Sequence, residues 1–173
     1  QDVVNLFTWE DLRDVTLVAH SYGGWPVTGA LETIADRVSS LVYLDAFLPS
    51  DGQKGSDFLS TPIKAALAEA VARGDLSRPS PKAEFFKVNE KDRAYVDSKT
   101  TPQPNGIALQ AIKLTGAYEK VAKKAYIRAP AYTQAAFDAY FAEKSGKPGW
   151  KTMTVPYGHD VMIDAPGPLA DML

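Results

Sequence analysis

The chain has 173 residues, of which 45% are hydrophobic and 23% are charged, and its formal net charge is −2 at pH 7. This length suffices for one domain with a buried core, and the charge gives no sign of a nucleic-acid partner or of an anionic membrane surface. No apolar run is long enough to span a bilayer, and the absence of cysteine excludes disulfides and thiolate metal sites. With two histidines in the chain, we expect no metal and no cofactor; the composition fits a cytoplasmic location without excluding secretion.

A strand, a sharp turn and a helix are predicted around Ser21. Residues 15–19 form a short, β-branched apolar run, which is typical of a buried parallel strand. The residues that follow the turn, through about Ala35, show the helical spacing of apolar side chains. Small residues two positions before and after the serine, Ala19 and Gly23, would let the strand and the helix pass close together.

A serine at such a corner has a chemical use. A strained backbone would push its Oγ clear of the sheet edge, and the start of the helix supplies free N–H groups and a positive dipole end. The backbone N–H of Tyr22 would then be one oxyanion donor. We therefore take Ser21 as the candidate nucleophile.

Residues 39–47 predict the second strand of a right-handed strand–helix–strand unit, and hence a parallel sheet. Asp45 stands near the carboxyl end of this strand, at the same sheet edge as Ser21, where ligands bind in open α/β sheets. Because a lone acid in an apolar strand costs too much to bury unpaired, we expect Asp45 to have a partner.

The sequence pattern changes between residues 51 and 118, from alternating strands and helices to short helices alone. The sequence predicts short helices over 61–73, 90–99 and 107–114, separated by proline-rich breaks, and shows no sustained strand pattern. Strands are expected again over the two C-terminal segments 123–128 and 150–157, with helices over 131–144 and from Pro166 onwards.

A serine nucleophile needs an adjacent base, and the chain offers two histidines for that role. His20 precedes Ser21 and points away from it by strand alternation, so we interpret it as a structural or wall residue. His159 follows the last strand on a glycine-containing loop at the carboxyl edge, from which a base can reach Ser21. The alternative is that His159 is a solvated loop residue.

Four segments carry a resemblance to a known family: LVAHSYGG, LVYLDAFLP, KLTGAYEKVAKKAYI and VPYGHDVMIDAPGPLADML. They are similar to the small serine esterases of the α/β-hydrolase superfamily, nearest to the plant methylesterases and hydroxynitrile lyases and to related bacterial carboxylesterases. Ser21 would lie on the nucleophile elbow G-x-S-x-G, with Ala19 in place of the first glycine. The resemblance implies an α/β class and the α/β-hydrolase fold, a parallel sheet flanked by helices with a helical cap insertion.

The resemblance also implies how the chain divides. Residues 1–50 and 119–173 would form the hydrolase core, the latter carrying the catalytic histidine, and residues 51–118 the helical cap. A surface layer without a gating role is the alternative for the cap. The N-terminal strands of the fold have no counterpart in this chain. We expect that missing N-terminal segment, with its second oxyanion donor, as a companion chain or as a piece cleaved from the same precursor.

The position of the acid departs from the commonest pattern of the superfamily. There the acid usually follows the strand before the histidine's strand, but residues 128–134 hold no carboxylate. Some families place it at the end of the strand after the nucleophile helix, which is the place of Asp45. We therefore predict that Asp45 binds His159 Nδ1, with Asp138 as the alternative; Asp160 adjoins the base, which is poor geometry.

The resemblance implies a serine hydrolase that cleaves a small-molecule carboxylic ester through an acyl-serine intermediate, using Ser21, His159 and Asp45. An amide, lactone or thioester is the alternative substrate class. A ligand-binding, receptor-like protein on the same scaffold with little turnover is the alternative function. Hydroxynitrile lyases carry a lysine where this chain has Asp160, which disfavours cyanohydrin cleavage. Four apolar residues near the predicted site are candidate substrate-binding residues: Trp25, Phe47, Leu48 and Met162.

Overall fold

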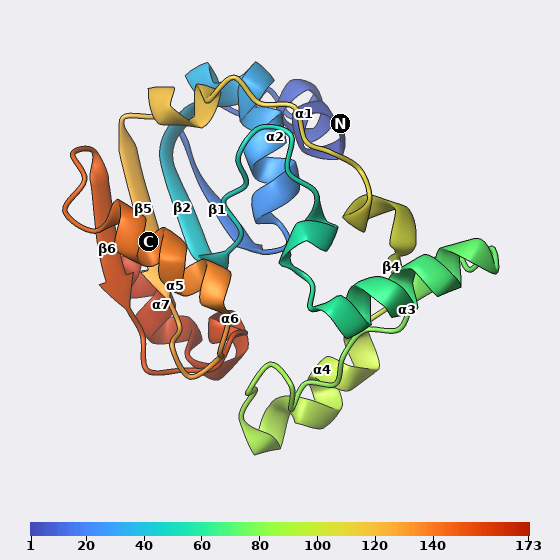
Figure 1. Ribbon diagram of the computed structural model, residues 1–173. Coiled ribbons are helices and arrows are strands. Elements are labelled where there is room, and N and C mark those ends of the chain that lie inside the picture. Colours follow the sequence, from blue (N-terminus) through green and yellow to red (C-terminus); the bar gives the residue numbers. More distant parts are fainter.

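The computed structural model describes residues 1–173 and is organised around a four-stranded sheet (Figure 1). The strand order is β1-β2-β5-β6, and every neighbouring pair is parallel, as the sequence predicted. The strands are β1 (Val15–Ser21), β2 (Val38–Ala46), β5 (Lys123–Arg128) and β6 (Trp150–Thr154).

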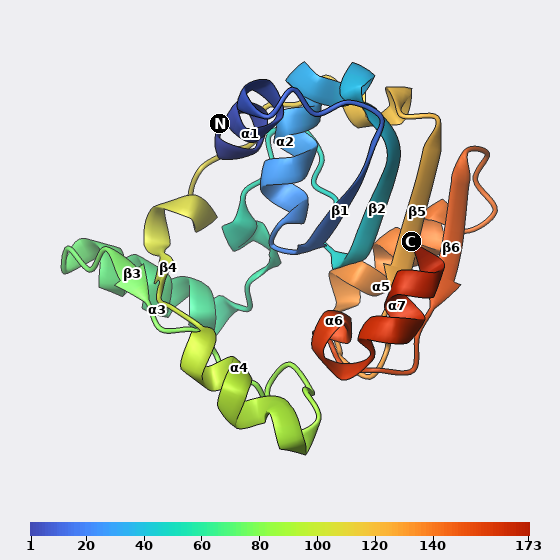
Figure 2. The same cartoon turned by 180° about the vertical axis from the view of Figure 1, so that it is seen from behind.

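Helices cover both faces of this sheet (Figures 1 and 2). Alternate residues of the central strand β2 belong to different cores: Leu41 and Tyr43 pack with α2, whereas Val42 and Leu44 pack with α6 and α7. Three helices contribute to the first core: α1 (Asp2–Trp9), α2 (Gly24–Ile34) and α5 (Ala135–Lys144). No helix of the structure is both long and apolar enough to cross a membrane. The other helices around the sheet are α6 (Val161–Asp164) and α7 (Pro166–Met172).

Strand β2 is buried without interruption from Leu41 to Ala46. A parallel strand covered on both faces needs such an apolar run, and this explains why the sequence has no alternation here. Asp45 is the exception within the run, and its side chain is 0% exposed. The strand therefore carries a carboxylate into the centre of the molecule, close to its carboxyl end.

Residues 51–118 contribute no strand to the main sheet. The helical part of this segment lies beyond the carboxyl edge of the sheet, and the chain then returns to the opposite edge, where β5 begins (Figures 1 and 2). Their main helices are α3 (Thr61–Ala72) and α4 (Arg93–Lys99), close to the predicted ranges. Two short strands, β3 (Ser77–Arg78) and β4 (Gln103–Pro104), pair in an antiparallel way that the sequence did not indicate. Each is two residues long, too short to show a periodic pattern.

The predicted helix over residues 107–114 is wrong. Only a short 3₁₀ turn, Asn105–Ala108, forms near there. The backbone of Ile112 instead pairs with the turn after β2, donating to the carbonyl of Gln53 and accepting from the N–H of Gly52, both at 2.9 Å. These tertiary hydrogen bonds replace the intrahelical ones that the apolar spacing favoured.

Two glycines of α2 have opposite surroundings, which gives a test of the packing between α2 and β2. A Cβ at Gly24 would lie 1.8 Å from the carbonyl oxygen of Phe47, whereas a Cβ at Gly29 would meet only the Ile112 side chain at 3.6 Å. We expect Gly24→Ala to lower the free energy of unfolding by about 1–3 kcal/mol or more through overpacking. Gly29→Ala should raise it by about 0.5–1 kcal/mol, since alanine is the better helix former. Urea unfolding measures both, and equal stabilities would contradict the close approach.

Candidate active site

Ser21 ends β1 in a sharp turn at the carboxyl edge of the sheet. Its φ of 53° lies in the left-handed region, which costs a non-glycine residue free energy and marks the strained corner that the sequence predicted. The turn is closed by the N–H of Gly23, which donates to the His20 carbonyl at 2.7 Å. The N–H of Tyr22 makes no hydrogen bond within the chain and stands just before α2. It is therefore free to donate to a ligand.

Three side chains from separate elements form one hydrogen-bonded line. His159 Nε2 lies 2.7 Å from Ser21 Oγ, and His159 Nδ1 lies 2.6 Å from Asp45 Oδ2. The imidazole is 2% exposed and the carboxylate 0%. Since a carboxylate only accepts, Nδ1 carries a proton, and this leaves the Nε2 lone pair facing the serine hydroxyl.

The buried carboxylate of Asp45 divides its two oxygens between partners. Oδ2 faces His159, while Oδ1 accepts from Arg128 Nη1 at 2.6 Å and from the N–H of Ala129 at 3.0 Å. The alternative acid, Asp138, does not reach the histidine; it accepts from Arg128 Nε at 2.8 Å. Arg128 was not singled out from the sequence, because nothing in its local pattern shows that it faces Asp45 from the neighbouring part of the sheet.

Aromatic rings enclose the imidazole of His159. The ring centroids of His20 and Tyr132 lie 4.5 Å from it, that of Phe86 5.5 Å and that of Phe137 5.8 Å. Backbone contacts hold the same residue: its N–H donates to the Phe86 carbonyl at 2.9 Å, and its carbonyl accepts from His20 Nε2 at 3.0 Å. His20 is thus the wall residue expected from the sequence, whereas the three other rings were missed.

Asp164 joins segment 51–118 to the loop that carries His159. Its Oδ1 accepts from the backbone N–H and the side-chain amide of Asn89, at 3.0 and 2.8 Å, and its Oδ2 accepts from the N–H of Gly158 at 3.2 Å. A Cβ at Gly158 would lie 2.2 Å from the carbonyl oxygen of Lys87, so a glycine is needed where the two segments meet. The sequence offered no sign of this junction.

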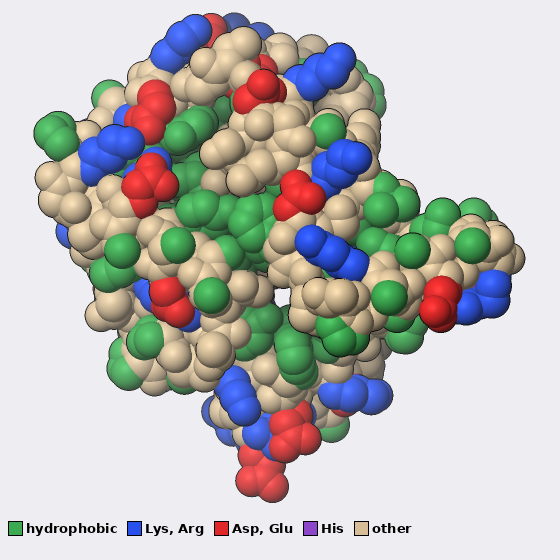
Figure 3. Space-filling model, viewed as in Figure 1, with side chains coloured by type: hydrophobic (Ala, Val, Ile, Leu, Met, Phe, Trp, Pro, Cys, Tyr) green, Lys and Arg blue, Asp and Glu red, His purple; other side chains and the backbone are tan.

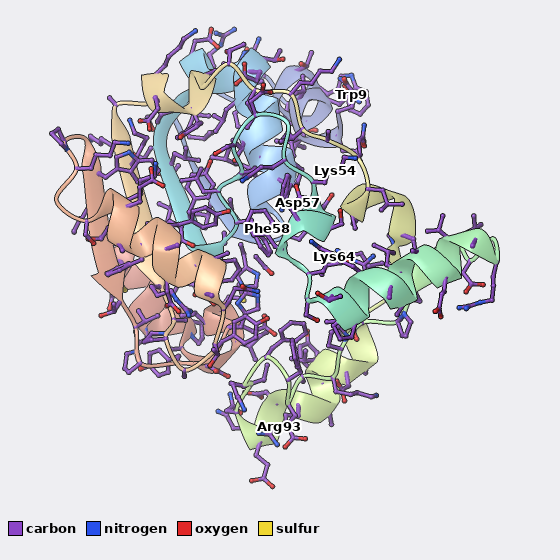
Figure 4. The ribbon with its side chains drawn as sticks, in the orientation of Figure 1. Trp9, Lys54, Asp57, Phe58, Lys64 and Arg93 are labelled. Carbon is purple, nitrogen blue, oxygen red and sulfur yellow. The ribbon has the colours of Figure 1, made fainter.

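The four candidate substrate-binding residues fall into two groups. The rings of Trp25 and Phe47 lie 6.3 Å apart, and Phe58 contacts both at 6.0 and 5.3 Å. Phe58 belongs to segment 51–118, and Figure 4 labels it on the side of the segment that faces the sheet layer; Figure 3 shows hydrophobic side chains gathered over this part of the surface. Leu48 is instead buried in the first core, and Met162 packs against the second. Only the first group therefore lies beside the turn at Ser21.

Two titratable groups near His159 have shifted pKa values. Burial, followed by the proximity of His159, lowers the pKa of His20 to about 4, so this ring is neutral at pH 7. Burial raises the pKa of the Asp160 carboxyl. Donor atoms of His20, His159 and Asp160 lie within 4.8 Å of one another. Because both ring nitrogens of His159 already contact Ser21 and Asp45, we assign no metal to this cluster.

The lowered pKa of His20 predicts a pH dependence of stability. The unfolded chain binds a proton at this histidine near pH 6.5 and the folded chain only near pH 4. Stability is therefore fully present above pH 6.5 and falls as the pH drops from there toward 4, by roughly 2–3 kcal/mol. We expect His20→Gln, which keeps a donor for the His159 carbonyl, to remove this part of the loss. Urea unfolding at several pH values measures the difference, and parallel pH curves for the two proteins would contradict it.

The sequence of the chain matches a known family over almost its whole length. Residues 1–172 match the Alpha/beta hydrolase family. The carbendazim hydrolyzing esterase of Nocardioides sp. (strain SG-4G) is 36% identical over 184 residues, which cover 100% of this chain and 75% of the relative.

Solved structures share the fold at lower identity. An extracellular alpha/beta-hydrolase from a Paenibacillus species has a TM-score of 0.74 at 19% identity, over 98% of this chain and 74% of the other. A methylesterase from Arabidopsis gives 0.66 at 19%, over 98% and 72%, and a pyrethroid hydrolase from Sphingobium faniae JZ-2 gives 0.64 at 18%, over 99% and 73%. The parallel sheet, the family match and the 36% identical relative together show that this chain belongs to the alpha/beta hydrolase family.

Proposed function

We propose that the chain is a serine hydrolase that cleaves a small carboxylic ester with a Ser21–His159–Asp45 triad. The observation that carries the proposal is the line of hydrogen bonds from Ser21 Oγ through the imidazole to Asp45, with distances of 2.7 and 2.6 Å. A serine hydroxyl needs an adjacent base, and the base needs an acid that fixes its tautomer. Both requirements are met within one buried site.

The proposed reaction has two halves. In the first, His159 Nε2 takes the proton of Ser21 Oγ as the oxygen attacks the ester carbonyl, and the N–H of Tyr22 donates to the developing oxyanion. Asp45 stabilises the imidazolium, which then gives its proton to the leaving alcohol. In the second half, His159 takes a proton from water as the water attacks the acyl-serine. The acid leaves, and Ser21 regains its proton.

The relatives support an ester as the substrate class. The Nocardioides relative is named as an esterase, and one structural neighbour is named as a methylesterase. Amides, lactones and thioesters react by the same steps and stay as alternatives within the proposal. We propose the aromatic residues Trp25, Phe47 and Phe58 as the wall of the substrate site, since their rings contact one another beside the turn at Ser21.

A fluorophosphonate probe, read by denaturing intact mass, tests the nucleophile. We expect one label on the natural chain, none on Ser21→Ala, and an unchanged label on the control Ser50→Ala, whose side chain is exposed. Asp45→Asn should lower kcat by about 10⁴-fold, because the amide favours the wrong tautomer of the histidine. A folded natural chain that takes no label, or binds esters without repeated turnover, would favour the ligand-binding alternative. The companion segment stays a prediction, and a second polypeptide in the same spectrum would support it.

Asp164→Ala tests whether the junction with segment 51–118 positions His159. Loss of its acceptors releases the N–H of Gly158 and both donors of Asn89. We expect kcat/KM to fall by on the order of 10–100-fold, because small displacements of a catalytic group are costly. Asp171→Ala removes an exposed acid of α7 and serves as the matched control. Equal kcat/KM for the two variants would show that the junction does not position the base.

A further inference from the structure

Arg128 is a buried cation beside the proposed catalytic acid. It ends β5, its side chain is 3% exposed, and its Nη1 lies 2.6 Å from Asp45 Oδ1. The same nitrogen donates to the Ala129 carbonyl at 2.6 Å, and Nη2 donates to the Tyr132 carbonyl at 2.7 Å. Nε donates to Asp138 Oδ1 at 2.8 Å, so all three nitrogens of the guanidinium donate hydrogen bonds within the chain. Such a planar fork holds its partners in a fixed geometry.

The charge of this guanidinium is fixed. Burial alone would lower the pKa of Arg128, but the hydrogen bond that it donates to Asp138 and the charge of Asp45 more than offset this and hold the pKa above its usual range. The side chain of Asp138 is 59% exposed and contacts Nε of the guanidinium, whereas Asp45 contacts Nη1. The Asp45–His159 pair therefore always faces a positive charge.

We propose that Arg128 is a positioning residue that aims Asp45 Oδ2 at His159 and limits how readily the Asp45–His159 pair binds a proton. The inference rests on the proposed function and deepens it. Arg128 and the Ala129 N–H occupy Oδ1 and leave only Oδ2 for the imidazole. The positive charge of Arg128 also offsets part of the negative charge of Asp45. Asp45 therefore stabilises a His159 imidazolium less strongly than it would alone.

The sign of the pH effect follows from the charge alone. Without the cation, the pair binds a proton more readily, whether the proton sits on His159 or on Asp45. Activity needs the unprotonated base, so the acid limb of the kcat/KM profile must move to higher pH. Without the carboxylate of Asp138, less of the positive charge of the guanidinium is compensated. The acid limb of the kcat/KM profile must then move to lower pH.

Four other titratable groups lie near the pair. Tyr126 of β5 and Tyr132 of the following loop have pKa values raised by burial, so both phenols stay neutral near pH 7. His20 of β1 has a pKa of about 4 and is neutral there as well. Burial raises the pKa of the Asp160 carboxyl, and this residue adjoins His159. The measurements are therefore repeated in an Asp160→Asn background.

The test compares the variants Arg128→Met, Arg128→Lys and Asp138→Asn, each checked for folding by thermal unfolding. The readouts are the pH profile of kcat/KM with a chromogenic acetate ester and the NMR titration midpoint of the His159 ring, assigned with His20→Gln. For Arg128→Met we expect kcat to fall by on the order of 10–100-fold with little change in KM, and both pH readouts to rise by about one unit. Arg128→Lys should return both readouts toward the natural values, and Asp138→Asn should shift them slightly downward.

A folded Arg128→Met protein with unchanged kcat would overturn the positioning role, and unchanged pH readouts would overturn the electrostatic one. If Arg128→Met does not fold, Asp138→Asn decides by the direction of its shift, because its side chain is mostly exposed and its loss leaves the core intact. The NMR midpoint needs no turnover. A natural chain that does not cleave esters would therefore refute the proposed function without deciding the role of Arg128.

Discussion

The carboxylate of Asp45 is the group on which the rest of the site depends. A charge that is fully buried costs several kcal/mol unless hydrogen bonds and opposite charge compensate it. Here the compensation comes from two other elements, Arg128 at the end of β5 and His159 after β6. The strand order β1-β2-β5-β6 makes this possible, because it places β2 between the strand that ends in Ser21 and the strand that ends in Arg128. The sheet topology therefore determines which residues can compensate the charge of Asp45.

Segment 51–118 completes the surroundings of His159. The sheet supplies Asp45 and Ser21, which hold the two ring nitrogens of His159. The segment supplies Phe86, whose carbonyl takes the backbone N–H of His159 and whose ring stacks on the imidazole. Packing by aromatic rings lowers the local dielectric, which strengthens the hydrogen bonds of the imidazole and keeps His20 neutral beside it.

Local patterns in the sequence were enough for the four strands of the main sheet and for the positions of Ser21, Asp45 and His159 at its carboxyl edge. The β-branched run before Ser21 and the apolar run around Asp45 are bounded by turn residues, and parallel strands with such bounds end at one edge. The contact of Asp45 with His159 was predicted with the help of the family resemblance, and the other contacts between distant segments were not accessible from local patterns. Arg128 sits in an ordinary strand pattern, Phe86 in a polar stretch, and residues 107–114 kept a helical spacing although Ile112 pairs with Gln53. The periodicity of apolar residues indicates which face of an element is buried, but it does not indicate which other element that face contacts.

The two anchors of His159 differ in strength, and this has a consequence for the site. The core anchor is a buried, charge-assisted network in which Asp45 is held from the side opposite the imidazole. The anchor from segment 51–118 is one backbone hydrogen bond and the partly buried junction at Asp164, with no charge pair. The orientation of the His159 ring is thus set by Asp45 and Ser21 of the sheet, and the segment adds one of the four rings that enclose it, that of Phe86.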